Sequence, residues 1–389
     1  MIRFLSSVAM TLIAASQPTP ITISADGVLQ KDGQPYRAIG VNYYSAFVRV
    51  LQDADDRSYD RGFAELARRE IPFARFAACG FWPSDWRMYL DDRDTYFERL
   101  DGVVRSAERH GIGLIPSLFW WSGAVSDIVD EPRSALGESD SETAAFIRRY
   151  TRELVMRYRD SPAIWAWEFG NEYNLEMDLP NAAEHRPHVI AQKGTRTTRS
   201  EADDLTSDMI LTATRIFADA VRAVDSRRPV ITGHSLPRPS ASHQRSEGSW
   251  TRDTPSEFQQ ELLRTHPAPF DVISVHMYPT ELPNRFDADD TTYEHVLEQV
   301  VDAARRSRNA VFVGEFGAPR GTDQGDMEWT RAENLKLLRA IEESGVAIAA
   351  IWVFDFDAQE PTWNISPDND RAYLLDALSE ANARLSKER

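Results

Sequence analysis

Two glutamates in this chain each stand at the end of an apolar run. Glu172 ends a run that begins at Trp165 and reads Trp-Ala-Trp-Glu-Phe-Gly-Asn-Glu, and Glu315 ends Val-Phe-Val-Gly-Glu, which begins at Val311. Such runs predict buried strands, and barrel enzymes carry their chemistry at the C-terminal ends of buried strands. A pair of facing carboxyl groups is what cleavage of a glycosidic bond requires, one as proton donor and one as nucleophile or base.

Polar and aromatic residues follow other apolar runs in the same way. Arg75, His276, Tyr278 and Trp352 all have this position. Aromatic faces bind the C–H faces of sugars, and polar groups bind sugar hydroxyls. These residues therefore predict a carbohydrate site around the two carboxylates.

Eight strand-like runs alternate with eight helical patterns. The expected strands are residues 36–42, 71–77, 113–119, 163–169, 228–232, 271–276, 310–315 and 347–354. The expected helices are residues 59–69, 96–110, 141–158, 201–224, 255–264, 292–306, 327–344 and 368–385. Strict alternation predicts an α/β fold, a (β/α)8 TIM barrel. A doubly wound open sheet is the rival, but no Gly-x-Gly-x-x-Gly follows an early strand.

The connections predict which face of this barrel carries the site. Segments after strands are long, as in residues 170–200 and 233–254, whereas several segments before strands are short. This asymmetry places the elaborated loops at the C-terminal ends of the strands. Near the N-terminus, two strand-like runs flank Lys31-Asp32-Gly33-Gln34. Because Asp-Gly is a hairpin signal, we expect a short β-hairpin that covers one end of the barrel.

Composition limits the possible partners. The chain has 389 residues, a net charge of −17 and a pI near 5.0, which disfavours nucleic acid and anionic membrane surfaces but leaves neutral substrates open. Cys79 is the single cysteine, so no intrachain disulfide can form. We expect a monomer.

The first residues have the pattern of a signal peptide. Arg3 precedes the short apolar run 4–15, and the small residues 14–16 at the end of this run offer a cleavage site. A buried N-terminal helix is the alternative. We expect residues 1–16 to be a signal peptide of a secreted or periplasmic protein, and residues 17–389 to form one catalytic domain.

The strand-end residues together resemble glycoside hydrolase family five, which belongs to a retaining clan and includes cellulases and mannanases. The segment Trp167 to Glu172, Trp-Glu-Phe-Gly-Asn-Glu, is similar to the Trp-Glu-Leu-x-Asn-Glu signature of that family. Glu315, Arg75, the pair His276-x-Tyr278 and Trp352 match further positions of its pattern. The likeness extends over nearly the whole chain after residue 16.

The resemblance implies a role for each matching residue and no cofactor or metal. Glu172 would be the general acid/base, and Glu315 the nucleophile that forms a covalent glycosyl-enzyme with net retention. Arg75 and Tyr278 would hydrogen-bond Glu315. Asn171 would bind the sugar 2-hydroxyl, His276 would position the acid/base or the sugar, and Trp352 would form the floor of the subsite where cleavage occurs.

Two departures from the family pattern favour a mannanase-like or divergent member of the family over a cellulase. Many cellulases of the family have a His after strand three, where this chain has Trp120 and Trp121, and Tyr173 replaces the Pro common after Asn-Glu. We expect Trp120, Trp121 and Tyr43 to contact the substrate. Further aromatic residues near the mouth suggest several sugar subsites, namely Phe81, Trp82, Trp86, Trp250 and Trp363.

The expected function is therefore an endo-β-1,4-mannanase-like enzyme acting on a β-linked oligo- or polysaccharide. Alternatives of the same fold are an endo-β-1,4-glucanase or an exo-acting β-mannosidase or β-glucosidase, made so by long loops that block one end of the cleft. A non-catalytic sugar-binding barrel would be expected to lack one carboxylate, and both are present. A metal-dependent barrel hydrolase would need a His-x-His pair after strand one, where Asn42-Tyr43-Tyr44 stands.

Overall fold

Eight parallel strands form the centre of the molecule. The computed structural model describes residues 19–283, 285–286, 291–320 and 327–388, so the expected signal peptide lies outside the described residues. The strands are β4 (Ala38–Asn42), β5 (Phe73–Ala77), β6 (Gly113–Phe119), β7 (Trp167–Gly170), β8 (Val230–Ile231), β9 (Val272–Met277), β10 (Ala310–Phe316) and β11 (Ile348–Ile351). They are hydrogen-bonded in the order β8-β7-β6-β5-β4-β11-β10-β9.

The gap between the two end strands is bridged by one aspartate. The backbone N–H of Asp271 donates to the carbonyl of Val230 at 3.3 Å, and the N–H of Val230 donates to the Asp271 carboxylate at 2.9 Å. This exchange leaves the barrel nearly closed and satisfies backbone groups that an open edge would expose. The predicted (β/α)8 barrel is confirmed.

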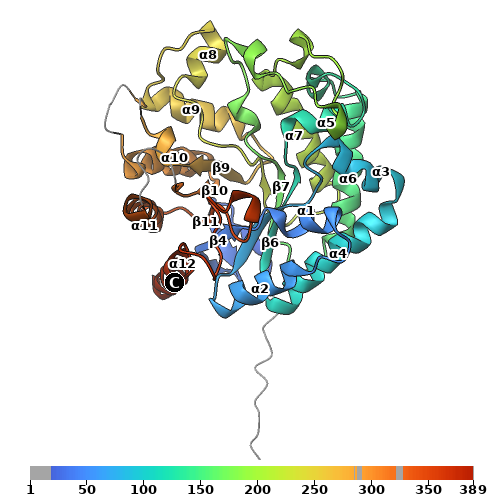
Figure 1. Ribbon diagram of the computed structural model, residues 1–389. Coiled ribbons are helices and arrows are strands. Elements are labelled where there is room, and N and C mark those ends of the chain that lie inside the picture. The colour runs from blue at the N-terminus through green and yellow to red at the C-terminus, as the bar shows by residue number, and fades with distance from the viewer. Residues whose placement is uncertain (1–18, 284, 287–290, 321–326, 389) are drawn as a thin grey trace, which may run out of the picture.

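Helices surround the strands as an outer ring (Figure 1). Those that follow the strands in turn are α2 (Ser58–Arg68), α4 (Arg93–His110), α6 (Glu142–Tyr158), α7 (Ser207–Arg222), α9 (Pro255–Thr265), α10 (Tyr293–Ser307), α11 (Met327–Ser344) and α12 (Tyr373–Leu385). Shorter helices lie within the loops that leave the strands, namely α1 (Ser45–Gln52), α3 (Arg87–Asp91), α5 (Ser122–Asp127) and α8 (Ala241–Glu247). Within the described residues, no helix combines the length and apolar character needed to cross a bilayer.

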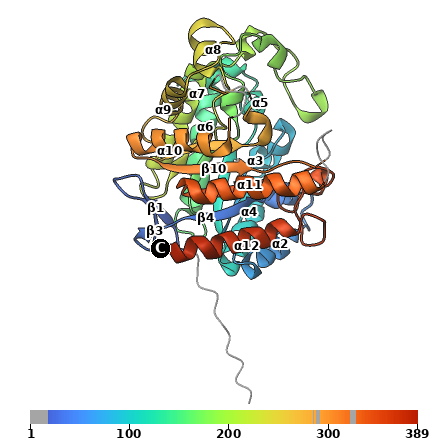
Figure 2. The ribbon, with the colours of Figure 1, turned by 90° about the vertical axis from the view of Figure 1, so that its left-hand side faces the viewer.

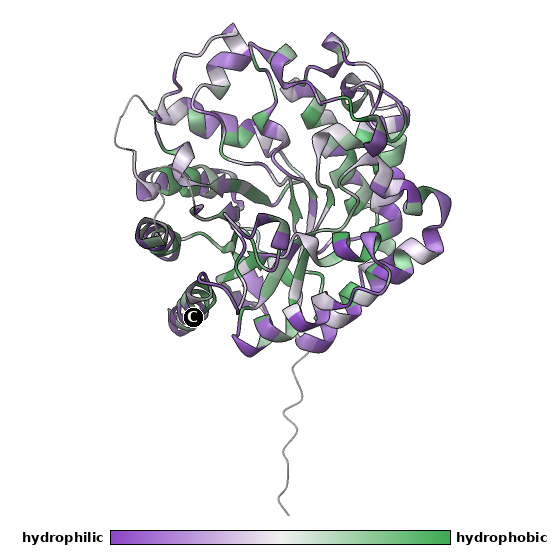
Figure 3. Ribbon diagram, viewed as in Figure 1, coloured by the Kyte–Doolittle hydropathy of each residue, from purple (hydrophilic) through white to green (hydrophobic). Residues whose placement is uncertain are grey.

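Apolar residues concentrate on the strands and on the helix faces that turn toward them (Figure 3). All eight strands are buried along their described length, because their inner side chains fill the barrel and their outer side chains pack under the helices. Local signals fix several helix starts. Thr254, Pro255 and Glu257 form a capping box at the start of α9, where the helix was expected to begin.

Several predicted boundaries differ from the structure, and helix α7 and strand β7 show why. Helix α7 begins at Ser207 instead of residue 201, because Asp203 is buried and accepts hydrogen bonds from the backbone of Arg133 and from its own short 3-10 turn. Strand β7 begins at Trp167 instead of residue 163, since Ile164 makes only an isolated bridge to Leu114. A hydrophobic pattern shows which residues are buried, but it does not show which of them form backbone hydrogen bonds with a neighbouring strand.

The N-terminal hairpin has one strand more than predicted. Strands β1 (Ile21–Ile23), β2 (Leu29–Lys31) and β3 (Gln34–Pro35) form an antiparallel meander, which lies at the end of the barrel from which β4 and β10 start (Figure 2). Leu29 and Tyr36 join a buried cluster with residues of the strand beginnings, and the Lys31 ammonium lies 4.9 Å from the ring centroid of Trp165. The meander therefore closes the bottom of the barrel.

We expect Leu29→Ala to destabilise the fold without changing catalysis. The Leu29 side chain is 2% exposed, and truncating a buried Leu costs roughly 2–5 kcal/mol of unfolding free energy. Urea unfolding measures the loss, and kcat should stay at the wild-type value because the meander covers the end opposite the C-terminal loops. Val28→Ala is the matched control, since Val28 is 43% exposed and should change stability by under about 0.5 kcal/mol. Equal stability of the two variants would contradict the closing role of the meander.

Candidate active site

A single guanidinium joins the polar groups inside the barrel. The side chain of Arg75, on β5, is fully buried. Its Nε donates to both oxygens of Glu168 at 2.8 and 3.0 Å, its Nη1 donates to Glu315 Oε1 at 2.7 Å and to Asn42 Oδ1 at 2.9 Å, and its Nη2 donates to Asn171 Oδ1 at 2.8 Å. Two carboxylates compensate one cation, as a buried charge requires.

Asn42 and Trp120 hold this guanidinium in place. The Asn42 amide donates to the carbonyls of Gly314 and Ala350 at 2.9 and 3.0 Å, which directs its oxygen to Arg75. The face of the Trp120 ring lies 4.6 Å from the guanidinium carbon, a cation–π contact. The sequence pattern places Asn42 at the end of the first barrel strand, but it does not predict this role.

Glu315 receives a hydrogen bond on each carboxylate oxygen. Arg75 donates to Oε1, and the hydroxyl of Tyr278 donates to Oε2 at 2.6 Å. Burial raises the pKa of Tyr278 well above its ordinary value, and the Glu315 charge raises it further. Tyr278 therefore keeps its proton and acts as a donor.

Glu172 has a backbone conformation that two glycines allow. Its φ is +55°, in the left-handed region that side chains rarely adopt, and its N–H donates to the carbonyl of Gly233 at 2.9 Å. Gly233 has φ +75°, and a Cβ atom there would lie 1.8 Å from the carbonyl oxygen of Gly170. Only glycine fits this approach, so Gly233 brings the ends of β7 and β8 together and fixes the direction of Glu172.

The side chain of Glu172 is held by His276. The Nδ1 atom of His276 lies 2.8 Å from Glu172 Oε1 and 3.6 Å from Glu315 Oε2. Burial lowers the pKa of His276 to about 3, so the ring is neutral. Its Nε2 is buried and has no partner among the described residues, which favours a lone pair there and the proton on Nδ1. Glu172 Oε1 is therefore an acceptor, and a proton on this carboxyl resides on Oε2.

The environments of the two glutamates differ. The Glu172 side chain is 29% exposed and that of Glu315 only 5%. Burial raises the pKa of Glu172, and the charge of Arg75 and a hydrogen bond from Ser235 oppose this rise. Glu172 is thus biased toward its protonated form, whereas Glu315 accepts hydrogen bonds from the Arg75 cation and the Tyr278 phenol. This is the division of roles that acid and nucleophile need.

The separation of the two carboxyl groups is short. Oxygen atoms of Glu172 and Glu315 lie within 4.8 Å of each other. Carboxyl groups roughly 5–5.5 Å apart serve displacement through a covalent intermediate, whereas inversion needs roughly 6.5–9.5 Å to admit a water molecule. The geometry fits the retaining arrangement.

Aromatic residues form one wall beside these groups. Trp352 follows β11, and its ring stacks on Trp120 with centroids 6.0 Å apart and an interplanar angle of 28°. The Trp352 indole N–H donates to Gln359 at 2.8 Å, and the peptide bond from Trp352 to Val353 is cis. Tyr44 contacts both rings. Trp352 is half-buried and Trp120 is 6% exposed, so Trp352 presents the more accessible face.

The expectation that Tyr43 contacts substrate is wrong. Its side chain is fully buried, its ring packs on Phe63 and Phe354, and its hydroxyl donates to Asp355 at 2.7 Å. The neighbouring Tyr44 lies against the tryptophan wall instead. Strand β4 ends at Asn42, and Tyr44 already has the helical backbone conformation of the residue that precedes α1. The chain therefore turns between the two tyrosines, and only Tyr44 reaches the tryptophan wall.

The other aromatic residues that were expected near the mouth differ in burial. Trp86 is 1% exposed and belongs to the core, while Trp250 is 57% exposed on the loop after α8. Trp121 is half-buried, stacks on Phe81 with ring centroids 5.5 Å apart and contacts Trp82 at 4.9 Å. These three rings form a cluster on the loops after β5 and β6.

A family model decides the relationship of this chain to known proteins. The model described as cellulase (glycosyl hydrolase family 5) matches residues 60–356. The chain belongs to glycosyl hydrolase family 5. The matched range contains every strand-end residue that carried the resemblance, so the predicted family is confirmed.

Curated relatives of this family 5 chain match only over segments. A probable mannan endo-1,4-beta-mannosidase A-1 of Aspergillus terreus is 38% identical over an alignment of 112 residues, and the match covers 25% of this chain and 28% of the relative. A mannan endo-1,4-beta-mannosidase F of Aspergillus clavatus is 39% identical over 80 residues, 19% of this chain and 18% of the relative. The chain thus spans less than a third of the length of the curated relatives it matches.

Solved structures share the fold. An endo-1,4-beta-mannanase from Rhizomucor miehei aligns with a TM-score of 0.66 and 16% identity, covering 95% of this chain and all of that one. An exo-beta-1,4-mannosidase from an Opitutaceae bacterium aligns with a TM-score of 0.65 and 17% identity, covering 94% of this chain and 63% of that one. At this identity the likeness establishes the TIM barrel.

Two clusters of side chains in the described residues have metal-ligand geometry, and protein donors already occupy both. Glu172, His276 and Glu315 form one cluster, whose Glu315 oxygens accept from Arg75 and Tyr278. The other is His243, Asp253 and Glu257. There Asp253 accepts from His243 and the backbone of Ser242, and Glu257 caps α9. In both clusters, protein donors therefore already bind carboxylate oxygens.

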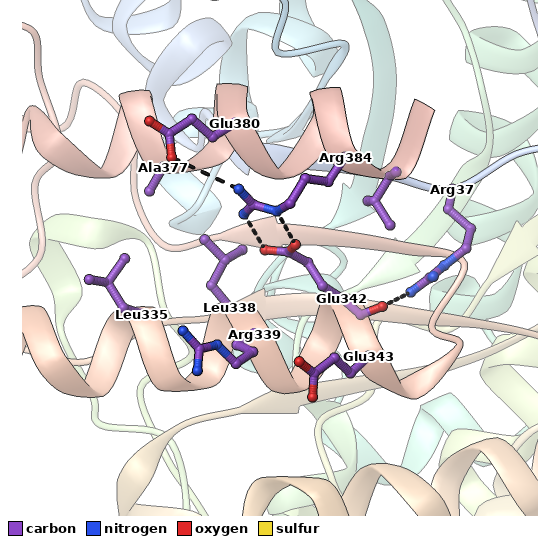
Figure 4. Close-up of a pocket in the computed structure, with 10 residues that line it drawn as sticks. Arg37, Leu335, Leu338, Arg339, Glu342, Glu343, Ala377, Glu380 and Arg384 are labelled. Atoms are coloured by element: carbon purple, nitrogen blue, oxygen red, sulfur yellow. Dashed lines mark hydrogen bonds and ion pairs between the residues drawn. The ribbon is translucent and has the colours of Figure 1, made fainter. Parts of the chain in front are cut away.

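A groove of about 750 Å³ lies far from this chemistry, between α11 and α12 on the outer wall (Figure 4). Arg384 and Glu342 form a two-bond ion pair across it at 2.8 and 2.9 Å, and Arg37 donates to the carbonyl of Glu342 at 2.7 Å. Arg384 and Glu342 thus pair with each other across the groove, and the strand-end residues described above lie elsewhere.

We expect Arg75→Met to destabilise the fold by about 3–5 kcal/mol, because it leaves buried carboxylates without their cation. Burial already raises the pKa of Glu168, and Arg75 opposes that rise. In the variant the folded-state pKa rises further above the unfolded value, so stability decreases as pH increases through it. Urea unfolding should show a larger deficit at pH 8 than at pH 5. Arg68→Met is the control, since Arg68 pairs with Glu65 at the surface, and should leave the midpoint nearly unchanged. A deficit independent of pH would contradict this account.

Proposed function

We propose that this family 5 chain is a retaining β-glycoside hydrolase in which Glu172 is the general acid/base and Glu315 the nucleophile. The observation that carries the proposal is the pair of carboxyl groups at the ends of β7 and β10, with oxygens within 4.8 Å of each other and different environments. The pair fits double displacement, which needs no cofactor.

In the first step, a carboxylate oxygen of Glu315 attacks the anomeric carbon while Glu172 gives its proton to the glycosidic oxygen. The C–O bond to the leaving sugar breaks, and an ester bond to Glu315 forms. Arg75 and Tyr278 hold Glu315 by two hydrogen bonds of 2.7 and 2.6 Å, which removes the freedom of the nucleophile before reaction. His276 binds Glu172 Oε1. The acid proton therefore resides on Oε2, from which it is given to the leaving group.

In the second step, Glu172 is a carboxylate and takes a proton from water as the water oxygen attacks the anomeric carbon. The ester bond to Glu315 breaks, and Glu172 regains its proton. Two inversions give net retention. Asn171 accepts from Arg75 through its oxygen, which turns its amide NH2 toward a bound sugar as the donor for the 2-hydroxyl. Trp352 stacks under the same sugar ring.

We further propose that the substrate is a β-1,4-linked mannan cleaved internally. Support comes from Trp120 and Trp121 in place of the His common in cellulases, and from segment matches to relatives named mannan endo-1,4-beta-mannosidase. The polymer would reach the enzyme outside the cytoplasm if residues 1–16 are a signal peptide, and we propose secretion or periplasmic location of a monomeric domain from residue 17.

One observation favours exo action as a second candidate. The long loop after β7 contains a short 3-10 turn, Ala191–Lys193, which packs on the turn Pro83–Trp86 after β5. The Lys193 ammonium lies 5.6 Å from the ring centroid of Trp82. A loop seated on this aromatic cluster would shorten the cleft on that side and restrict cleavage to chain ends.

Glu315→Ala should abolish turnover of a β-mannoside, because no ester intermediate can form, and Glu172→Ala should lower kcat/KM on a natural glycan by about 10²–10⁴-fold, the contribution of general acid catalysis. Initial rates and circular dichroism measure activity and folding. Azide should restore Glu315→Ala turnover and give an inverted glycosyl azide. Near-normal turnover by either folded variant would refute the assignment. Asp357→Asn is the matched control, an exposed carboxylate on the loop after β11.

Product analysis should separate substrate and mode of action. We expect turnover on mannan and glucomannan to exceed that on carboxymethylcellulose by at least tenfold, with oligomers of mixed length appearing first. Chromatography of early products measures this. Release of mannose alone would select the exo candidate, and preference for carboxymethylcellulose would overturn the mannan proposal.

A further inference from the structure

A third carboxyl group lies near the proton donor. Glu281 ends the short turn Pro279–Glu281 after β9, and its Oε1 accepts a hydrogen bond of 3.1 Å from the hydroxyl of Ser235. The same side chain also acts on Glu172, because it lowers the pKa of that carboxyl group. A serine hydroxyl can donate once and accept as well, so Ser235 can connect the two carboxyl groups in one chain of hydrogen bonds.

Ser235 is fixed relative to Glu172. The backbone N–H of Ser235 donates to Asn174 Oδ1 at 2.9 Å, and the Asn174 amide donates back to the Ser235 carbonyl at 2.8 Å. Asn174 belongs to the 3-10 turn Tyr173–Leu175, which Glu172 directly precedes. The reciprocal bonds therefore hold the bridging hydroxyl against the segment that carries the acid/base.

Glu281 has no counter-ion among the described residues. Arg285 is close, but its guanidinium donates to the backbone carbonyls of Glu281 and Pro237 at 2.5 and 2.7 Å, so its bonds bypass the Glu281 carboxyl. Burial raises the pKa of Glu281 to about 8, the charge of Arg285 opposes this rise, and the charge of Glu172 adds to it.

Other titratable or charged groups lie near Glu172 and Arg285, on either side of the hydrogen-bonded group formed with Ser235. Arg75 and His276 face Glu172, and Asp253 faces Arg285. None of the three makes a hydrogen bond to the Glu281 carboxyl. Because the charge of Glu172 acts on Glu281, the two carboxyl groups cannot both ionise without mutual repulsion, and their protons then belong to the pair.

We propose that Glu281 and Glu172 share a proton through the Ser235 hydroxyl, so that Glu281 is a positioning residue that keeps the acid/base protonated at a higher pH than Glu172 alone would allow. With the proton on Glu281, its O–H donates to Ser235 and Ser235 donates to the Glu172 carboxylate. Reversal of both bonds moves one proton onto Glu172 without a change in total charge. The inference rests on the proposed role of Glu172.

The test is the pH profile of Glu281→Gln. Glutamine keeps the size of the side chain and a bond to Ser235 but cannot hold the second proton. We expect the basic limb of kcat/KM to move to lower pH by about half a unit or more, as coupled carboxyl groups imply, with KM near the wild-type value at the acidic plateau. A folded variant with an unshifted basic limb overturns the proposal. Asp357→Asn, which removes a carboxylate from the exposed loop after β11, should leave the profile unchanged.

Two further measurements complete the test. In a Ser235→Ala background the shift caused by Glu281→Gln should shrink, and a shift of the same size would overturn the path through Ser235. Infrared difference spectra of the wild-type enzyme between pH 5 and pH 9 should show a carboxyl band that titrates well above the ordinary range, and its absence would also overturn the proposal. Failure of the proposed function is distinguishable, because then Glu172→Ala itself keeps its activity.

Discussion

The buried guanidinium of Arg75 is the interaction on which the catalytic end of the barrel depends. A cation inside an apolar barrel is tolerable only where carboxylates and amides satisfy all its donors. Arg75 on β5 is satisfied by groups that Asn42, Glu168 and Glu315 bring from β4, β7 and β10. The positions of four strands are thereby tied to one charge, and Glu315, the proposed nucleophile, is one of the groups that bind it. The requirement that keeps the charge stable in the core also keeps the Glu315 carboxylate in place.

Much of this arrangement could be predicted from the sequence. Strand β6 occupies residues 113–119, as its apolar run indicated, and the runs that end in Glu172 and Glu315 are strands whose ends meet across the mouth. These predictions succeed because parallel strands buried on both faces need long apolar runs, which the sequence displays directly. The family resemblance rested on the same strand ends.

The rest depended on contacts that no pattern encodes. Tyr43 and Tyr44 are chemically identical neighbours, and only the three-dimensional structure shows that one enters the pocket wall and the other the layer under the helices. Ser235 and Glu281 belong to irregular loops after β8 and β9. In such loops neither hydrophobic periodicity nor secondary-structure propensity predicts which side chains meet. Gly233 could have drawn notice as a glycine after a strand, yet its function appears only when Gly170 is placed beside it.

Because the chain has few lysines, Lys193 offers a position for attaching a label at the mouth of the barrel. The chain has four lysines, at 31, 193, 336 and 387. Lys31 lies on the meander that closes the bottom, and Lys336 lies on α11 in the outer ring, whereas Lys193 lies over the Trp82 ring on the catalytic face. An amine-reactive fluorophore attached at Lys193 would have a tryptophan as its immediate neighbour, an efficient quencher at contact distance. Its emission would report whether the loop after β7 leaves the aromatic cluster when a glycan occupies the cleft.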